Sequence, residues 1–219
     1  AEWRLWGACS YKWAYLPSHI MAVIPCPMGH TCRPRRAHFA TIHRLEDSIV
    51  PYNISFISLG CAKNQVNCEQ MMASVQAAGH TIQVQPEGAD VVVVNTCGFL
   101  QSACEEAIDN ILEMAELKRA GQVQKILVTG CMTQRYKQDV LNELPEVDGI
   151  LGTGSYGDIC AAIDEVMGAS GLRPCHLGSI HTAPQDGGRI LSTPPWYAYL
   201  RIAEGCDNRC AYCIIPFIR

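Results

Sequence analysis

Hydrophobic and polar positions change their pattern near Pro51. Before that point no helical or alternating period persists, and prolines interrupt the apolar residues. From Asn53 onwards, short β-branched runs alternate with longer stretches of helical character. Strands that alternate with helices of ten or more residues are typical of βαβ units and a parallel sheet. The pattern therefore predicts one doubly wound, flavodoxin-like α/β domain over residues 53–168.

The expected elements of this domain follow one another along the chain. Strands are expected at residues 54–59, 81–85, 91–94, 126–129 and 150–151. Helices are expected from about 64 to 79, from 102 to 120, after Cys131 up to 144, and from 155 to 168. Ser102 with Glu105 predicts a capping box, and Ser155 is expected to cap the last helix. The run of four valines at 91–94 predicts a strand buried on both faces.

The segment before this domain, residues 1–52, has a different composition. It holds three of the four tryptophans, and its six basic against three acidic residues give a formal charge of +3. We expect a poorly ordered extension here. The alternative is a zinc site, although the spacing fits no common pattern; its ligands would be Cys26, His30, Cys32 and His38.

Two further segments follow the α/β domain. Residues 169–195 are rich in Gly, Pro and Ser, which predicts a linker. Residues 197–202 alternate between apolar and polar and predict a new strand. We therefore expect residues 196–219 to be the truncated start of a second domain.

Composition narrows the class of protein. Apolar residues make up 48% of the 219 residues, enough to bury a core, which excludes wholesale disorder. Charged residues are 17% and the net charge is −4, which excludes the strongly basic footprint of a nucleic-acid coat protein. The longest apolar runs fall far short of the ~20 residues of a membrane helix. We expect no membrane association.

Thirteen cysteines are an unusual number for such a chain. The count is odd, and the chain lacks the short secreted format in which cysteines pair into disulfides. A reducing, cytoplasmic setting is expected. In that setting clustered cysteines are more often metal ligands or catalysts than cross-links.

The first set of cysteines is Cys61, Cys97 and Cys131. Each follows a predicted strand, and in a parallel sheet such loops all emerge at the carboxyl edge. Three thiolates there suit an iron–sulfur cluster with one iron left open. The alternative is that all three are ordinary buried cysteines, but their repeated position favours a cluster. Glycines that allow close backbone approach flank them at positions 60, 98 and 130.

The second set is Cys206, Cys210 and Cys213, spaced C-x3-C-x2-C. A closed zinc site would need a fourth ligand, and no histidine or cysteine follows. A bacterial ferredoxin would use C-x2-C-x2-C with a further cysteine. Three thiolates within eight residues again suit one cubane with an uncommitted iron.

Five sequence blocks carry a resemblance to a known family. They cover residues 53 to 219 and read SLGCAKNQVNCEQM, VVVVNTCGFL, VTGCMTQRY, LPEVD and YLRIAEGCDNRCAYCIIPFIR. The C-x3-C-x-aromatic-C motif is similar to that of radical S-adenosylmethionine enzymes. Together the blocks, which occur in the family's order, resemble the methylthiotransferase family and within it the ribosomal-protein branch.

That resemblance implies two 4Fe–4S clusters. The Cys206, Cys210 and Cys213 cluster would bind S-adenosylmethionine at its open iron and cleave it to a 5′-deoxyadenosyl radical, with Tyr212 near the adenine. The auxiliary cluster, which supplies or carries the sulfur, would be held by Cys61, Cys97 and Cys131. No catalytic residue is assigned beyond these ligands. The resemblance also implies that residues 196–219 open a partial TIM barrel.

The resemblance also implies a substrate and partners. In that branch, a methylthio group replaces a hydrogen on the β-carbon of one aspartate in small-subunit ribosomal protein twelve. The cofactor carries this step because an unactivated C–H bond is beyond acid–base chemistry. An electron donor such as flavodoxin is implied. Since most of a barrel would be missing, we expect this chain alone to be inactive.

Two other functions stay open. A tRNA methylthiotransferase would use the same two clusters, but residues 53–219 carry eleven basic against eighteen acidic residues, a charge of −7, which disfavours an RNA partner. A non-catalytic iron–sulfur or zinc module is the second alternative.

Other residues near the two sets have simpler explanations. We expect Lys63 and Arg135 to be solvated, while Asn95 and Thr96 would bond cluster sulfurs or form a turn. The remaining cysteines of the α/β domain and linker are expected to be packing or surface thiols: Cys68, Cys104, Cys160 and Cys175.

Overall fold

The computed structural model describes residues 51–169, 171–181 and 187–219. All of them belong to one structural unit, Glu46–Arg219. The predicted N-terminal extension and its zinc alternative lie outside the described residues, except for Pro51 and Tyr52.

A single sheet of six parallel strands forms the centre of the fold. Its order is β2-β1-β3-β4-β5-β6. The order 2-1-3-4-5 within it is the doubly wound, flavodoxin-like one, which confirms the predicted fold class. The strands are β1 Asn53–Ser58, β2 Thr81–Gln83, β3 Val91–Thr96, β4 Lys125–Gly130, β5 Gly149–Leu151 and β6 Cys175–His176.

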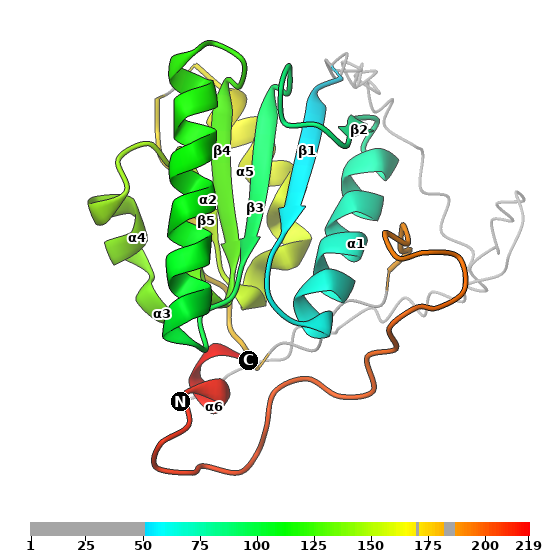
Figure 1. Cartoon of the computed structure of the whole chain (residues 1–219), viewed down its shortest axis with the longest axis vertical. Coiled ribbons are helices and arrows are strands. Elements are labelled where there is room, and N and C mark those ends of the chain that lie inside the picture. The colour runs from blue at the N-terminus through cyan, green and yellow to red at the C-terminus, as the bar shows by residue number, and fades with distance from the viewer. Residues whose placement is uncertain (1–50, 170, 182–186) are drawn as a thin grey trace, which may run out of the picture. The chain divides into compact units, whose positions relative to one another are not determined.

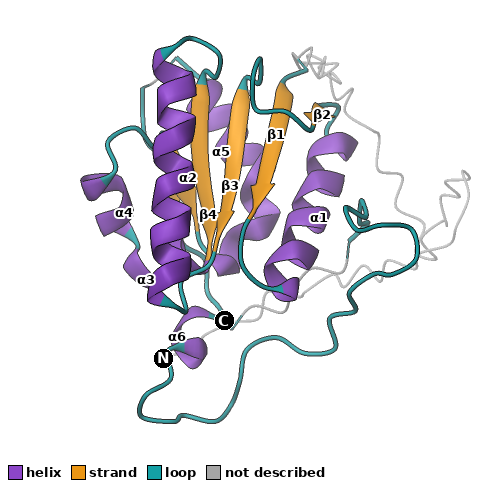
Figure 2. Cartoon of the chain, viewed as in Figure 1, coloured by secondary structure: helices purple, strands orange, loops and turns teal. Residues whose placement is uncertain are grey.

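Helices cover both faces of the sheet (Figures 1 and 2). α1 and α5 pack on one face, and α2, α3 and α4 pack on the other. Among the described residues, no helix has the length and apolar character needed to cross a membrane. The helices are α1 Ala62–Ala77, α2 Gln101–Arg119, α3 Cys131–Tyr136, α4 Gln138–Glu143, a 3₁₀ helix Thr153–Asp158, α5 Ile159–Met167 and α6 Ile215–Ile218.

β3 shows why the sheet is stable between these layers. All six of its residues are buried, as the valine run predicts. Val91 and Val93 pack with α1 and α5, while Val92 and Val94 pack with α2 on the other face. Because successive side chains of a strand point to opposite faces, four consecutive valines serve both cores.

The predicted capping roles of Ser102 and Ser155 are wrong. α2 begins one residue before Ser102, its N-cap is Leu100, and no side chain caps it. Ser155 lies within the 3₁₀ helix, and its hydroxyl instead accepts a hydrogen bond from the Gly178 amide at 2.7 Å. Sequence spacing alone does not show that the Ser155 hydroxyl hydrogen-bonds to a distant backbone amide.

The expected single helix up to residue 144 is two helices. Lys137 has φ +52° and separates α3 from α4. The break lets Met132 of α3 and Val140 and Leu141 of α4 all reach the same core. No glycine or proline at this point indicates the turn in advance.

The two C-terminal segments differ from the expectations in detail. Within the predicted linker, β6 adds a sixth strand by pairing with β5. The expected strand at residues 197–202 does not form. Leu200 and Ile202 are instead largely exposed, and a single strand without a partner leaves its backbone groups unpaired. The boundaries of a second domain stay a prediction.

Candidate functional site: three cysteine loops at the carboxyl edge

Three neighbouring strands bring the first set of cysteines to one edge of the sheet. β1, β3 and β4 are adjacent, and their register aligns Ser58 with Asn95 and Asn95 with Thr129. Cys61 follows β1 as the N-cap of α1, Cys97 follows β3, and Cys131 is the first residue of α3 directly after β4. The expected common edge is therefore present, although Cys131 begins a helix instead of lying in a loop.

Glycines let these three loops lie directly against one another. A Cβ on Gly60 would lie 2.8 Å from the Cys97 Cβ, and a Cβ on Gly98 would lie 2.6 Å from the carbonyl carbon of Cys131. Real Cβ atoms do not approach that closely, so each of these positions needs glycine. The three cysteine loops are thus in close backbone contact, with no room for a side chain at Gly60 or Gly98.

Asn64 in the first turns of α1 ties these loops together. Its Nδ2 donates to the Thr96 carbonyl at 2.8 Å and to the Leu59 carbonyl at 3.2 Å. Asn95 Nδ2 in turn donates to the Asn64 carbonyl at 2.7 Å. Asn64 is fully buried, and an asparagine inside a helix gives no sequence signal of such a role. Asn64 is therefore not singled out by its sequence position.

The expectations for Asn95 and Thr96 also change. Both belong to β3, so neither forms a turn. The Thr96 hydroxyl donates to the carbonyl of Thr129 at 2.7 Å and thereby links β3 to β4. These side chains hold the strand ends that carry the cysteines.

The three thiols differ in their exposure and electrostatics. Cys61 is exposed, Cys97 is half-buried and Cys131 is buried. Burial raises the pKa of the Cys131 thiol, the Arg219 guanidinium lowers it in part, and the nearby Cys97 and Cys61 raise it further. Cys131 therefore needs a compensating positive group to carry charge.

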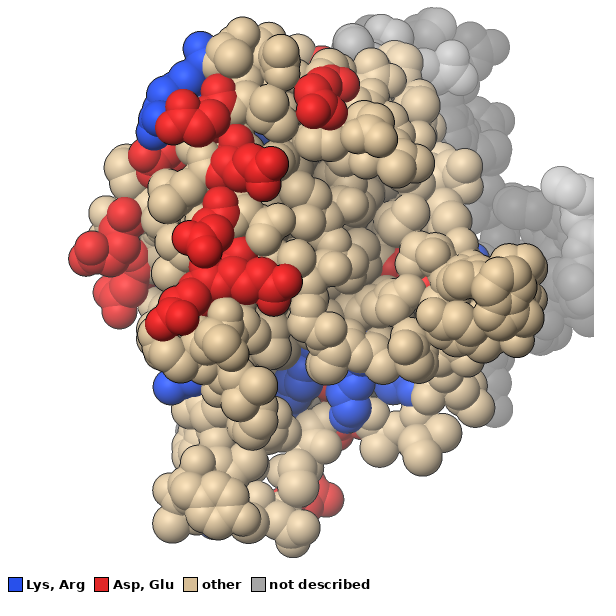
Figure 3. All heavy atoms as spheres, in the orientation of Figure 1, with Lys and Arg blue, Asp and Glu red and all other residues tan. Residues whose placement is uncertain are grey.

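Basic side chains gather at this edge, whereas acidic side chains lie over α2 (Figure 3). Lys63 Nζ donates to the Ala203 carbonyl at 3.0 Å, and Arg135 Nη1 donates to the Gly98 carbonyl at 2.8 Å. Both cations thus hold loops of the site instead of being simply solvated.

The donor set fits an iron–sulfur cluster by its chemistry. Cysteine thiolates are the usual ligands of such clusters, and three of them come from adjacent loops. Within the described ranges no three His, Cys, Asp or Glu side chains lie close enough to hold one metal ion. A cubane does not need its ligands to meet at one ion, because each thiolate binds a different iron. The role of these cysteines as ligands stays a prediction.

The second set of cysteines lies on a surface loop. Cys206 and Cys210 are exposed, and the Cys213 amide donates to the Cys210 carbonyl at 3.0 Å in a turn. Tyr212, the predicted S-adenosylmethionine contact, is 92% exposed. An ion pair of 2.7 Å between Arg219 and Glu204 closes the base of this loop.

A hollow of about 280 Å³ opens beside the base of the loop. The 3₁₀ helix and α1 line one side of it, and Arg201, Glu204 and Arg219 line the other. Arg201 Nη1 donates to Asn67 Oδ1 of α1 at 2.6 Å. Neither Glu204 nor Arg219 was singled out from the sequence, because their pairing depends on how the loop closes.

Outside the two sets, the part of the chain that the structure describes holds four more cysteines, which the sequence predicts to be packing or surface thiols. Burial raises the pKa of Cys68 to about 12, which makes it unreactive. Cys104 is also buried, Cys160 is half-buried and Cys175 is exposed in β6. Cys104 lies nearest to the first set, because its Sγ donates to the Cys97 carbonyl at 3.7 Å.

Comparison with known proteins agrees with this architecture. Residues 53–152 match the Uncharacterized protein family UPF0004. A protein of Syntrophomonas wolfei is 49% identical over 168 residues, which cover 76% of this chain and 38% of that protein. Proteins of Caldicellulosiruptor saccharolyticus (47% over 167 residues) and Lachnoclostridium phytofermentans (46% over 170) have the same two coverages.

These similarities place the chain in the methylthiotransferase family. The three relatives each bear the name Ribosomal protein uS12 methylthiotransferase RimO. The chain spans about 38% of the length of these relatives.

Proposed function

We propose that this protein takes part in the methylthiolation of ribosomal protein uS12, the reaction named for its relatives. The observation that carries the proposal is the arrangement of Cys61, Cys97 and Cys131 on three adjacent strands of a sheet that matches this family.

In the proposal, Cys61, Cys97 and Cys131 hold an auxiliary 4Fe–4S cluster, and Cys206, Cys210 and Cys213 hold the cluster of a radical S-adenosylmethionine enzyme. When bound, these groups supply the one-electron chemistry that an unactivated C–H bond requires. The chain itself supplies the thiol ligands and the loop contacts that fix their positions. Tyr212 is assigned to the adenine of S-adenosylmethionine.

The proposed substrate position is the β-carbon of one aspartate in uS12, with an electron donor such as flavodoxin as the second partner. A protein substrate is supported by the excess of acidic residues, which disfavours a polyanionic RNA. Because ribosomal proteins are synthesised and used in the cytoplasm, the proposal places the reaction there.

A chimera tests the proposal. Residues 53–219 replace the matching segment of the Syntrophomonas wolfei protein, and the chimera is expressed in bacteria that lack RimO. We expect mass spectrometry of uS12 to show the gain of one methylthio group on an aspartate. The matched control carries Cys61→Ala, Cys97→Ala and Cys131→Ala and is expected to leave uS12 unmodified.

Two results would contradict the proposal. Methylthiolated tRNA together with unmodified uS12 would assign the protein to the tRNA methylthiotransferases. Full modification of uS12 by the triple alanine chimera would show that the three cysteines are not needed.

A further inference from the structure

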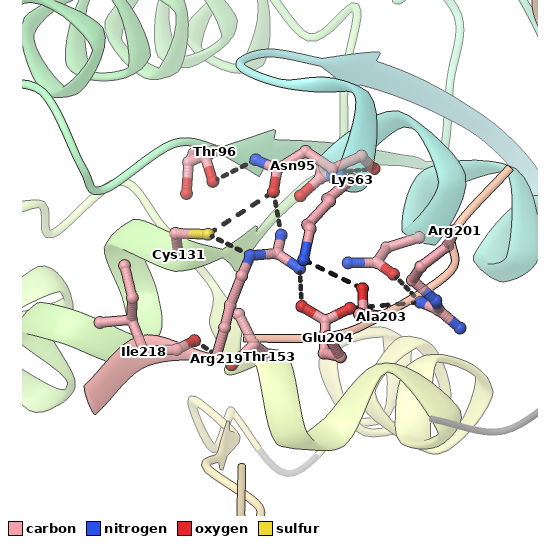
Figure 4. A network of polar contacts seen from close by, with 12 residues as sticks. Lys63, Asn95, Thr96, Cys131, Thr153, Arg201, Ala203, Glu204, Ile218 and Arg219 are labelled. Carbon is pink, nitrogen blue, oxygen red and sulfur yellow. Dashed lines mark hydrogen bonds and ion pairs between the residues drawn. The ribbon is translucent and has the colours of Figure 1, made fainter. Parts of the chain in front are cut away.

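Each nitrogen of the Arg219 guanidinium meets a different partner (Figure 4). Nε donates to the Cys131 Sγ at 3.2 Å, Nη1 lies 2.7 Å from Glu204 Oε1, and Nη2 donates to Asn64 Oδ1. The Cys131 thiol also donates to Asn64 Oδ1 at 3.5 Å. The Arg219 side chain is only 4% exposed. One buried side chain thus joins the base of the C-terminal cysteine loop to a cysteine of the first set.

The backbone around Arg219 is held from both sides. The Thr153 hydroxyl donates to the Ile218 carbonyl at 2.7 Å, and the Ile218 side chain is buried. On the other side, a Cβ on Gly205 would lie 2.7 Å from the Arg219 carbonyl oxygen, so the loop closes tightly there. The guanidinium is therefore oriented by its surroundings before any ligand binds.

The charges around Arg219 determine how its contact with Cys131 would affect a cluster. A guanidinium stays protonated at every accessible pH, and its partner Glu204 is shared with Arg201, which lies 3.7 Å from the other carboxylate oxygen. Three thiolates at the edge would add negative charge next to it. Lys63 and Arg135 donate to backbone carbonyls, whereas Arg219 donates to a cysteine sulfur.

We propose that Arg219 is a positioning residue of the auxiliary site, which orients Cys131 by donating a charged N–H···S hydrogen bond to its sulfur. This inference rests on the proposed function, because it takes Cys131 to be a cluster ligand. Hydrogen bonds to cluster sulfurs and nearby positive charge both favour the reduced cluster, which carries one more negative charge. Arg219 therefore sets the reduction potential of the cluster at Cys61, Cys97 and Cys131.

The test measures one cluster at a time. In the full chain, Cys206, Cys210 and Cys213 are replaced by alanine, and the protein is reconstituted anaerobically with iron and sulfide. The reduction potential is then measured for this parent, for Arg219→Met and for Arg219→Lys. Arg173→Met is the matched control, because the Arg173 guanidinium donates to the carbonyls of Val147 and Leu144 and to no cysteine.

We expect Arg219→Met to make reduction about tenfold less favourable, which corresponds to a potential about 59 mV lower for one electron. Arg219→Lys keeps the charge but not the oriented N–H group, so its reduction potential should lie between those of the parent and Arg219→Met. Arg173→Met should match the parent. Loss of iron from Arg219→Met with an unchanged circular dichroism spectrum would also support the role, since Cys131 would then be misplaced.

The outcomes separate this inference from the proposed function. If the parent binds iron and its reduction potential is unchanged in Arg219→Met and Arg219→Lys, the role of Arg219 is contradicted but the proposed function is not. A parent that binds no iron at Cys61, Cys97 and Cys131 contradicts both.

Discussion

Glu69 of α1 and Arg189 form a buried ion pair across 120 residues of sequence. Both Nε and Nη2 of Arg189 donate to Glu69 Oε2, at 2.9 and 2.6 Å, and the Glu69 carboxylate is fully buried. The amide and hydroxyl of Ser192 donate to the other oxygen at 2.9 and 2.8 Å. Both oxygens of the Glu69 carboxylate thus accept two hydrogen bonds each, and these bonds hold the predicted linker against the α/β domain.

Replacing Glu69 by glutamine should therefore destabilise the protein. An amide cannot accept from both partners as a carboxylate does, and Arg189 loses its counter-charge. We expect the free energy of unfolding in urea at pH 7 to fall by about 2 kcal/mol. Glu113→Gln on the exposed side of α2 is the control and should change it by less than about 0.5 kcal/mol.

The same pair makes this effect depend on pH. Burial alone would raise the pKa of Glu69, but the Ser192 and Arg189 contacts outweigh it and hold that pKa below its ordinary value of 4.5. The stabilisation is therefore complete above pH 4.5 and is lost as the pH falls through the folded-state pKa. The difference between parent and Glu69→Gln should narrow in acid. A difference that is constant from pH 7 down to pH 3 would contradict this account.

Gly98→Ala should disrupt the cysteine site more than it disrupts the fold. The new Cβ would press on the Cys131 backbone and push the Cys97 loop away. We expect an unfolding free energy lower by about 1–3 kcal/mol and less iron bound after reconstitution. Gly79→Ala has a comparable cost from its φ of +94°, about 1–2 kcal/mol, but nothing lies near its Cβ. It should bind iron like the parent, and equal iron losses in both variants would count against the stacked loops.

Asn64→Ala should lower stability because it removes the side-chain donor to the buried Thr96 carbonyl and to the part-buried Leu59 carbonyl. We expect a loss of about 2–3 kcal/mol in urea unfolding. The control is Asn110→Ala in α2, where the side chain donates to the Glu106 carbonyl one turn earlier on the helix surface. If both variants lost the same small amount, Asn64 would not be the centre of the loop contacts.

We expect the chain alone not to catalyse methylthiolation of uS12. Given S-adenosylmethionine, a reductant and uS12, it should form no methylthiolated product, because Cys206, Cys210 and Tyr212 are exposed to water, which would quench a radical formed beside them. Product detected by mass spectrometry would contradict this expectation.

The fold was largely predictable because its signals are local. The valine run of β3 and the glycines at 79 and 121, which both have positive φ just beyond a helix, mark element types and ends directly. The break at Lys137 and the hydroxyl of Ser155 depend on distant packing and distant amides, so they were not predictable. The expected strand at 197–202 fails because a strand also needs a partner.

The common edge of the first three cysteines was predictable from the sequence, whereas their role as ligands stays a prediction. Topology alone brings Cys61, Cys97 and Cys131 to one edge, since their strands are neighbours. The residues that support them were not predictable. Asn64 and Arg219 act through contacts between segments 155 residues apart, and neither residue type is unusual at its position.

Iron counting is the most direct test of the central claim, which is that two separate sets of three cysteines each hold a cluster. After anaerobic reconstitution, the chain should bind about eight irons with matching sulfide, and Cys61→Ala/Cys97→Ala/Cys131→Ala should bind about four. Eight irons in that triple variant, or one or two zinc ions in place of iron in the unaltered chain, would contradict the account.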